Sequence, residues 1–139
     1  MSVRGILIAG LIGSMGLVGC AQRRYDPPPS VIADPAAYPQ VVVSPDLTGW
    51  LAADKPVVTR GEDGTGVLRV TVPVRTLVAR GQTVRVQYRF IFLDGLGRPV
   101  SPEGDWRYVR MPANTQRFFE GNALDEKASD WRLEIRTAR

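Results

Sequence analysis

Two segments in the middle of the chain show strict alternation of apolar and polar residues. In residues 67–76 the even positions 68, 70, 72 and 74 are apolar. In residues 83–93 the even positions form one apolar face, while Arg85, Gln87 and Arg89 form the other. A period of two residues is typical of a β-strand that is buried on one face. The pattern therefore predicts two half-buried strands.

Shorter apolar runs, separated by turn-forming residues, flank these two strands. They predict further strands near residues 40–43, 56–59, 106–109, 116–119 and 131–135, with turns at 94–97 and 112–114. Residues 46–55 fit either a helical turn or an irregular crossing, and residues 123–129 fit one helical turn. Six or seven short strands without a long helical period indicate an all-β fold, a single β-sandwich.

The parity of the apolar positions constrains how the two alternating strands pair. Both apolar sets are even-numbered, so a two-residue loop closed by Ala79 and Gln82 would break the register. A three-residue connection, Arg80-Gly81-Gln82, or a bulge satisfies it. Pro73 has no N–H to donate, which predicts that its strand lies at a sheet edge or contains a bulge. We therefore expect the two strands to pair as neighbours.

Such pairing would place four arginines on one surface: Arg69, Arg75, Arg85 and Arg89. Arg85 and Arg89 would lie roughly 13 Å apart along their strand. Guanidinium groups bind phosphate and carboxylate in bidentate fashion, so this set is a candidate anion-binding face. The alternative is a solvated sheet face whose arginines pair with acidic residues and keep an edge soluble.

Residues 1–19 have the pattern of a secretion signal. Arg4 precedes an apolar, glycine-rich run that is shorter than the roughly 20 residues of a transmembrane helix. The run ends in Leu17-Val18-Gly19-Cys20, which is similar to the lipobox of bacterial lipoproteins, where the cysteine thiol takes a diacylglyceryl group. We predict that Cys20, the sole cysteine, is the lipidated N-terminus of the mature protein. The alternative is an uncleaved anchor with a chance cysteine.

Lipid attachment and the following residues predict where the protein lies. Lipoproteins of this type carry two or three acyl chains such as palmitate, whereas one chain alone anchors only marginally. Ala21 stands where an aspartate would, in many Gram-negative bacteria, retain the protein at the inner membrane, so we expect the periplasmic face of the outer membrane. Residues 20–38 are proline-rich and predict an extended tether, or a proline ligand for a partner groove. Residues 39–139 then form one domain.

Composition narrows the chemistry of this domain. The net charge is +4, and removal of Arg4 with the signal leaves 17 − 14 = +3. The chain has no histidine, so the commonest general base and a common metal ligand are missing. Export excludes nucleic acid as a partner and leaves envelope phosphates, carboxylated glycans and acidic proteins. We expect no enzymatic activity, no cofactor and no metal.

Two further sets of residues leave alternatives open. Asp94, Glu103 and Asp105 could approach one another as the paired carboxylates of glycoside hydrolysis do, although turns commonly carry acidic residues. Calcium binding there would lack the dense spacing of oxygen ligands. The aromatic residues fit core and rim packing, or a stacking platform for sugars: Trp50, Trp106, Trp131, Phe118 and Phe119.

Residues 41–136 resemble the YcfL-like family of small bacterial lipoproteins. The resemblance rests on the lipobox, on the strand and turn Tyr88-Arg89-Phe90-Ile91-Phe92-Leu93-Asp94-Gly95-Leu96-Gly97, on the turn at Pro112, and on the closing strand Trp131-Arg132-Leu133-Glu134-Ile135-Arg136. It implies an immunoglobulin-like β-sandwich and no assigned catalytic residue. The chain departs from the family in its long proline tether and high arginine content, which leaves open whether a partner is shared.

The sequence as a whole predicts an outer-membrane lipoprotein that acts as a non-enzymatic accessory or binding module for an envelope protein, such as cell-wall machinery. The first alternative is direct binding of an anionic envelope polymer, lipopolysaccharide or cell-wall glycan, by the arginine face. The second is a carboxylate-dependent hydrolase.

Overall fold

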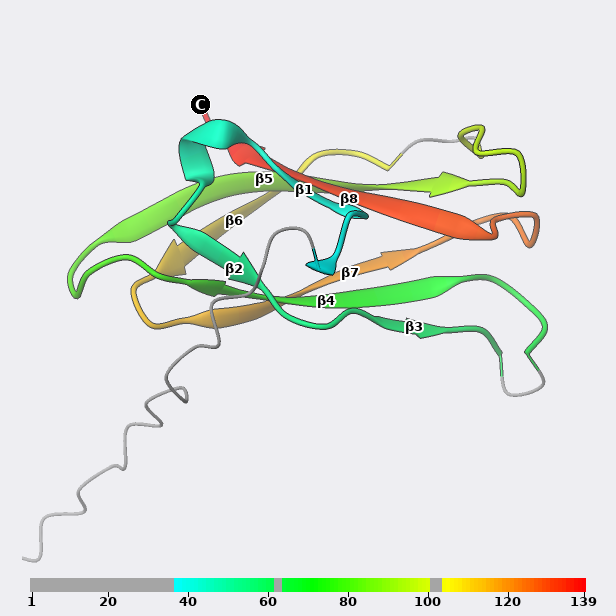
Figure 1. Ribbon diagram of the computed structural model, residues 1–139, viewed down its shortest axis with the longest axis horizontal. Helices are drawn as coiled ribbons and strands as arrows, with labels where there is room; N and C mark the ends of the chain where they lie inside the picture. Colours follow the sequence, from blue (N-terminus) through cyan, green and yellow to red (C-terminus); the bar gives the residue numbers. More distant parts are fainter. Residues whose placement is uncertain (1–36, 62–63, 101–103) are drawn as a thin grey trace, which may run out of the picture.

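The structure is a computed structural model that describes residues 37–61, 64–100 and 104–139. The described residues form two β-sheets stacked face to face (Figure 1). They contain the 3-10 helix η2 (Pro45–Leu47) and the strands β1 (Val41–Val43), β2 (Leu51–Ala53), β3 (Val57–Thr59), β4 (Arg69–Thr76), β5 (Thr83–Leu93), β6 (Arg107–Pro112), β7 (Gln116–Asn122) and β8 (Asp130–Thr137). The predicted all-β sandwich is confirmed. The signal segment, Cys20 and most of the tether lie outside the described residues.

The two sheets differ in their strand order. Sheet A has the order β1-β8-β5-β6, in which β1 runs parallel to β8 and the other pairs are antiparallel. Sheet B is built around β4, which pairs with β7 along one edge and with β2 and then β3 along the other. No helix in the described ranges is long and apolar enough to cross a membrane.

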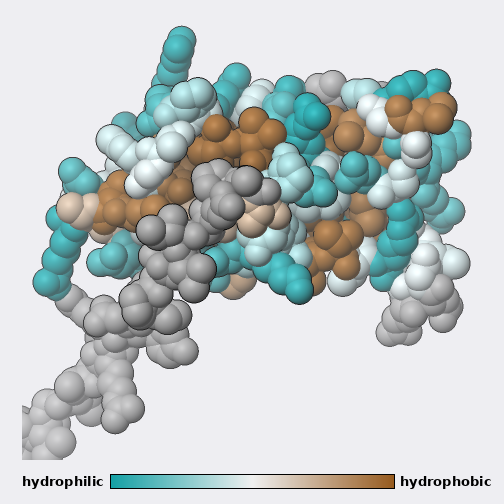
Figure 2. All heavy atoms as spheres, in the orientation of Figure 1, coloured by the Kyte–Doolittle hydropathy of each residue, from teal (hydrophilic) through white to brown (hydrophobic). Residues whose placement is uncertain are grey.

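The core lies between the sheets and uses the alternation seen in the sequence. Buried apolar side chains come from β4 and β5 at even positions and from β8 at odd positions: Val70, Val72, Val74, Val84, Val86, Tyr88, Phe90, Trp131, Leu133 and Ile135. Phe119 of β7 stacks on Tyr88 of β5, with ring centroids 4.1 Å apart and planes inclined by 8°. Figure 2 shows hydrophobic residues gathered along the side of the sandwich where β1, β2 and β3 lie.

The predicted pairing of the two alternating strands is wrong. β4 lies in sheet B and β5 in sheet A, so the segment between them crosses from one sheet to the other. Its turn is closed by the Gln82 N–H, which donates to the Ala79 C=O at 3.0 Å, and Gly81 takes a φ of +89°. Even positions of both strands still face the core. Each strand turns one face toward the core from its own sheet, and in both strands that face carries the even-numbered residues.

Pro73 lies in an interior strand, so the predicted sheet edge is also wrong. The N–H groups of even residues in β4 point toward β7, as shown by the bond from Thr76 N–H to Thr115 C=O. The missing N–H of Pro73 would point to the other side, where β2 has ended and β3 has not begun. The register between β2 and β3 shifts by one residue there, and the Asp54 N–H donates to the Pro73 C=O at 2.8 Å. The irregularity therefore lies in the neighbouring strand.

Two segments that the sequence left undecided are now assigned. Residues 46–55 contribute both the end of helix η2 and strand β2, which is why the strand count exceeds the prediction within the described residues. Residues 123–129 form turns rather than helix, and the Ala128 N–H donates to the Asp125 C=O at 3.2 Å.

Candidate binding surface on the outer face of sheet A

Arginine dominates the face of sheet A that points away from the core. Register places Arg85 of β5 directly opposite Arg110 of β6, and Gln87 between Tyr108 and Arg136. Arg89 lies opposite Glu134 in the next row. We call this face the basic surface and define it by Arg85, Arg89, Trp106, Tyr108, Arg110, Arg132 and Arg136.

Trp106 holds two of these arginines in place. The guanidinium carbon of Arg136 lies 3.7 Å from the centroid of the Trp106 ring, and that of Arg89 lies 4.8 Å away. The Arg136 Nε–H also donates to Gln87 Oε1 at 3.2 Å, and the Arg89 Nε–H donates to Glu134 Oε2 at 2.8 Å. Cation–π contacts contribute about 0.5–1 kcal/mol at exposed sites. The middle of the basic surface is therefore ordered without a ligand.

Arg85 and Arg110 have no such compensation. Both are exposed, and within residues 37–61, 64–100 and 104–139 neither forms an ion pair with an acidic side chain. Like charges directly opposite on antiparallel strands destabilise a sheet. This pair therefore costs stability in the free protein, and an anion placed between the two groups would relieve the repulsion.

Replacement of Arg110 with Gln is expected to raise the free energy of unfolding by about 0.2–1 kcal/mol at low salt, because it removes this repulsion. The gain should shrink as salt screens the charges over about 8–10 Å. Urea denaturation at two salt concentrations measures it. Arg132→Gln is the control, since Arg132 lies opposite Ile91 and has no arginine across the strand pair. A loss of stability in the Arg110 variant would show that this guanidinium is not repelled.

The structure divides the four arginines of the predicted face between two surfaces. Arg69 and Arg75 belong to β4, so they lie on the outer face of sheet B, across the sandwich from Arg85 and Arg89. Arg75 is largely buried, with 12% of its side chain exposed, and lies 2.8 Å from Asp54. The predicted shared face is therefore wrong, because it required β4 to pair with β5.

Sequence reasoning missed Arg110, Arg132 and Arg136 as members of the surface. A signal was present: Arg132, Glu134 and Arg136 alternate with the buried residues of β8, as Tyr108 and Arg110 alternate with those of β6. The alternation put them on an outer face. Only the pairing of β5 with both β6 and β8 shows that this face is shared.

Among the described residues, the acidic side chains proposed for catalysis, Asp94 and Asp105, do not form a cluster. Asp94 organises its own turn: Oδ1 accepts from the N–H groups of Leu96 and Arg98 at 2.9 and 3.0 Å, and Oδ2 lies 2.9 Å from the Arg98 guanidinium. The backbone N–H of Arg98 and then its side chain lower the pKa of Asp94. Asp105 is exposed, and Glu103 lies outside the described residues. The described residues contain no group of three or more His, Cys, Asp or Glu that could hold a metal ion.

The aromatic residues divide between the core and the surfaces. Trp131 and Phe119 are buried, whereas Trp50 and Phe118 are 50% and 59% exposed on the outer face of sheet B. Leu77 and Val57 are also exposed there. The Leu77 N–H donates to the Trp50 C=O, so these two residues are neighbours. We call Trp50, Val57, Leu77 and Phe118 the apolar surface. The outer face of sheet B thus carries exposed apolar side chains as well as Arg69 and Arg75.

Comparison with known proteins identifies relatives of this fold. The crystal structure of Cj0090 from Campylobacter jejuni has a TM-score of 0.58 and 22% sequence identity, over 71% of this chain and 98% of that one. A DUF1425 family member from Shewanella sp. pv-4 has a TM-score of 0.55 and 19% identity, over 64% of this chain and 79% of that one. No curated protein matches the chain. The family described as protein of unknown function DUF1425 matches residues 40–137, and the chain belongs to this uncharacterised family.

Proposed function

We propose that this protein is a lipid-anchored, non-enzymatic module of the bacterial envelope that binds an anionic envelope polymer through the basic surface. The observation that carries the proposal is the opposed pair Arg85 and Arg110, two exposed cations without an acidic partner in the described part of the chain. Arginine suits phosphate and carboxylate groups because its donors form a planar fork. Lipopolysaccharide and cell-wall glycan carry such groups.

The anchor in this proposal rests on the sequence. The lipobox at Cys20, the Ala21 that follows it and the resemblance to YcfL-like lipoproteins favour the periplasmic face of the outer membrane. A permanent anchor raises the effective concentration of the domain near a membrane-bound ligand, so a weak individual contact is sufficient. The proline-rich residues 20–38 would give the domain reach.

A binding role also agrees with the chemistry of the side chains. The chain has no histidine, and Asp94 is engaged in its own turn. Arg89 and Arg136 are held by Glu134, Gln87 and Trp106 as a fixed surface. A fixed cationic surface of this kind supports the binding of anions.

The test compares two triple variants in binding to purified lipopolysaccharide and to cell-wall glycan fragments. The basic-surface variant carries Arg85→Gln, Arg110→Gln and Arg132→Gln. The control carries Lys55→Gln, Arg69→Gln and Arg117→Gln. These exposed residues lie between β2 and β3, on β4 and on β7, respectively. Both variants lose the same number of positive charges.

We expect the basic-surface variant to bind at least about tenfold more weakly, since one charge-assisted hydrogen bond contributes about 1.5–3 kcal/mol. The control should bind nearly as the natural protein does. Affinity should fall with salt in the natural protein and fall less in the basic-surface variant. Equal weakening of both variants would show an unspecific charge effect and contradict the proposal.

A second candidate function is the accessory module for an envelope protein, such as cell-wall machinery. The observation that favours it is the apolar surface on sheet B, where large side chains such as Trp50 and Phe118 are about half exposed. Aromatic residues are enriched at the centres of protein interfaces. Under this alternative, the double variant Trp50→Ala and Phe118→Ala loses capture of a discrete envelope protein in cells, and the basic-surface substitutions leave that capture intact.

A further inference from the structure

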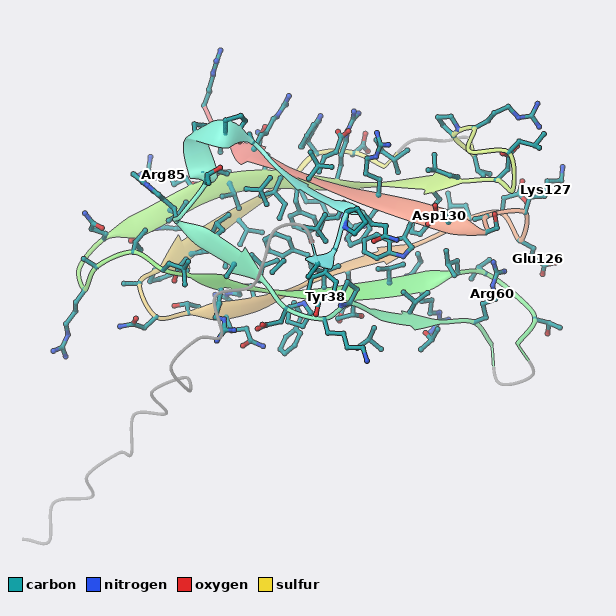
Figure 3. The ribbon with its side chains drawn as sticks, in the orientation of Figure 1. Tyr38, Arg60, Arg85, Glu126, Lys127 and Asp130 are labelled. Atoms are coloured by element: carbon teal, nitrogen blue, oxygen red, sulfur yellow. The ribbon has the colours of Figure 1, made fainter. Side chains whose placement is uncertain are left out.

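The pair Arg85 and Arg110 has a geometry that selects among anions. Directly opposite residues of an antiparallel pair have Cα atoms about 4.5–5.5 Å apart, so the two guanidinium groups can reach one small ligand. Figure 3 shows Arg85 projecting from β5 away from sheet B. The third position in this row of sheet A is occupied by Ala138, whose N–H donates to the Arg85 C=O at 3.0 Å. Its methyl group leaves the approach open.

The charge of the pair favours a dianion over a monoanion. A phosphate monoester carries about −1.5 to −2 at neutral pH and has three acceptor oxygens. Two guanidinium forks offer parallel pairs of N–H donors that match these oxygens. A carboxylate has one negative charge and would leave the second arginine uncompensated.

Tyr108 supplies a neighbouring flat surface. It lies two residues before Arg110 on β6, opposite Gln87, and is 56% exposed. Two residues along a strand span roughly 6.6 Å, about the size of a sugar ring. Trp106 on the same side is already covered by Arg136, whereas Tyr108 has no such cover in the described contacts.

We propose that Arg85 and Arg110 form a subsite for a phosphate monoester, with Tyr108 flanking the group that carries the phosphate. The subsite deepens the proposed function and rests on it, because it specifies which anionic group the basic surface recognises. Phosphorylated sugars and phosphate-ended lipid headgroups share this chemistry.

The experiment measures binding to the lipidated mature protein, residues 20–139, held in nanodiscs of uncharged lipid. The soluble probes are glucose 1-phosphate and glucuronate, which pair a similar ring with a phosphate or a carboxylate. The lipid probe is phosphatidic acid added to the disc. The variants are Arg85→Gln, Arg110→Gln and Tyr108→Ala, with Arg69→Gln, an exposed arginine on the outer face of sheet B, as the control.

We expect glucose 1-phosphate to bind about tenfold or more tightly than glucuronate, and either Arg85→Gln or Arg110→Gln to abolish that preference. Binding of glucose 1-phosphate should strengthen from pH 5 to pH 7.5 as the phosphate loses its second proton near pH 6. Tyr108→Ala should weaken the sugar phosphate more than phosphatidic acid, which separates the two sources of phosphate. Arg69→Gln should change little.

Equal affinity for glucose 1-phosphate and glucuronate would overturn the subsite, and so would a preference for phosphate that survives both arginine substitutions. If lipopolysaccharide binding still depends on the basic surface in that case, the proposed function stands without the subsite. If neither the polymer nor the small probes bind, both fail.

Discussion

Replacement of Phe119 with Ala should lower the free energy of unfolding by about 3–5 kcal/mol, the usual cost of deleting a buried aromatic ring. Phe119 is 1% exposed and lies between the sheets. Its ring stacks on Tyr88, so it joins β7 of sheet B to β5 of sheet A. Small domains have total stabilities of about 5–15 kcal/mol, so the variant should be close to unfolding.

Urea denaturation followed by circular dichroism measures this effect. The matched control is Phe118→Ala, which removes the same side chain from the neighbouring position of β7. Phe118 is 59% exposed on the opposite face of the strand, so its loss should change stability by about 0.5 kcal/mol or less. Similar losses for both variants would contradict the assignment of Phe119 to the core.

Replacement of Cys20 with Ser should release the protein from the membrane. Under the proposed function this thiol accepts the lipid, and each acyl CH₂ that enters a bilayer contributes about 0.8 kcal/mol. Without it, the glycine-rich residues 5–19 are too short and too weakly apolar to span a membrane stably. Fractionation of cells labelled with radioactive palmitate should find label in the membrane for the natural protein and none for the variant.

Ala21→Asp is the companion variant for location. It should keep the palmitate label but move the protein from the outer to the inner membrane in a Gram-negative host. Stable membrane attachment of the Cys20 variant without label would instead indicate an uncleaved anchor.

The sequence predicted the faces of the strands better than their partners. Alternation in β4 and β5 assigned Val72 and Tyr88 to the core and Arg85 to the surface, and the structure agrees. Parity of the buried positions is the same for a hairpin and for two strands that face each other across a core. To choose between these two arrangements, one must know that another strand already pairs with β4. One such strand is β2, which is only three residues long and shows no alternation in the sequence.

The same distinction between strand faces and strand partners applies to the candidate site. Arg85 and Arg89 were correctly placed together because both belong to one strand. Their true neighbours, Arg110 and Arg136, come from β6, the next strand along the chain, and from β8, the last strand. Both strands pair with β5 in sheet A, and the sequence did not show that pairing. Arg136 on β8 contacts Trp106, which directly precedes β6, across the intervening strand β5. No local sequence pattern could predict this contact.

The most direct test of the basic surface as the binding surface is to map the contact by nuclear magnetic resonance. Phosphorylated oligosaccharide from lipopolysaccharide is titrated into the isotope-labelled protein. The account predicts that the Nε–H signals of Arg85 and Arg110 and the indole signal of Trp106 shift, while the indole signal of Trp50 stays in place. Shifts confined to Trp50, Leu77 and Phe118 would contradict it and assign binding to the apolar surface of sheet B.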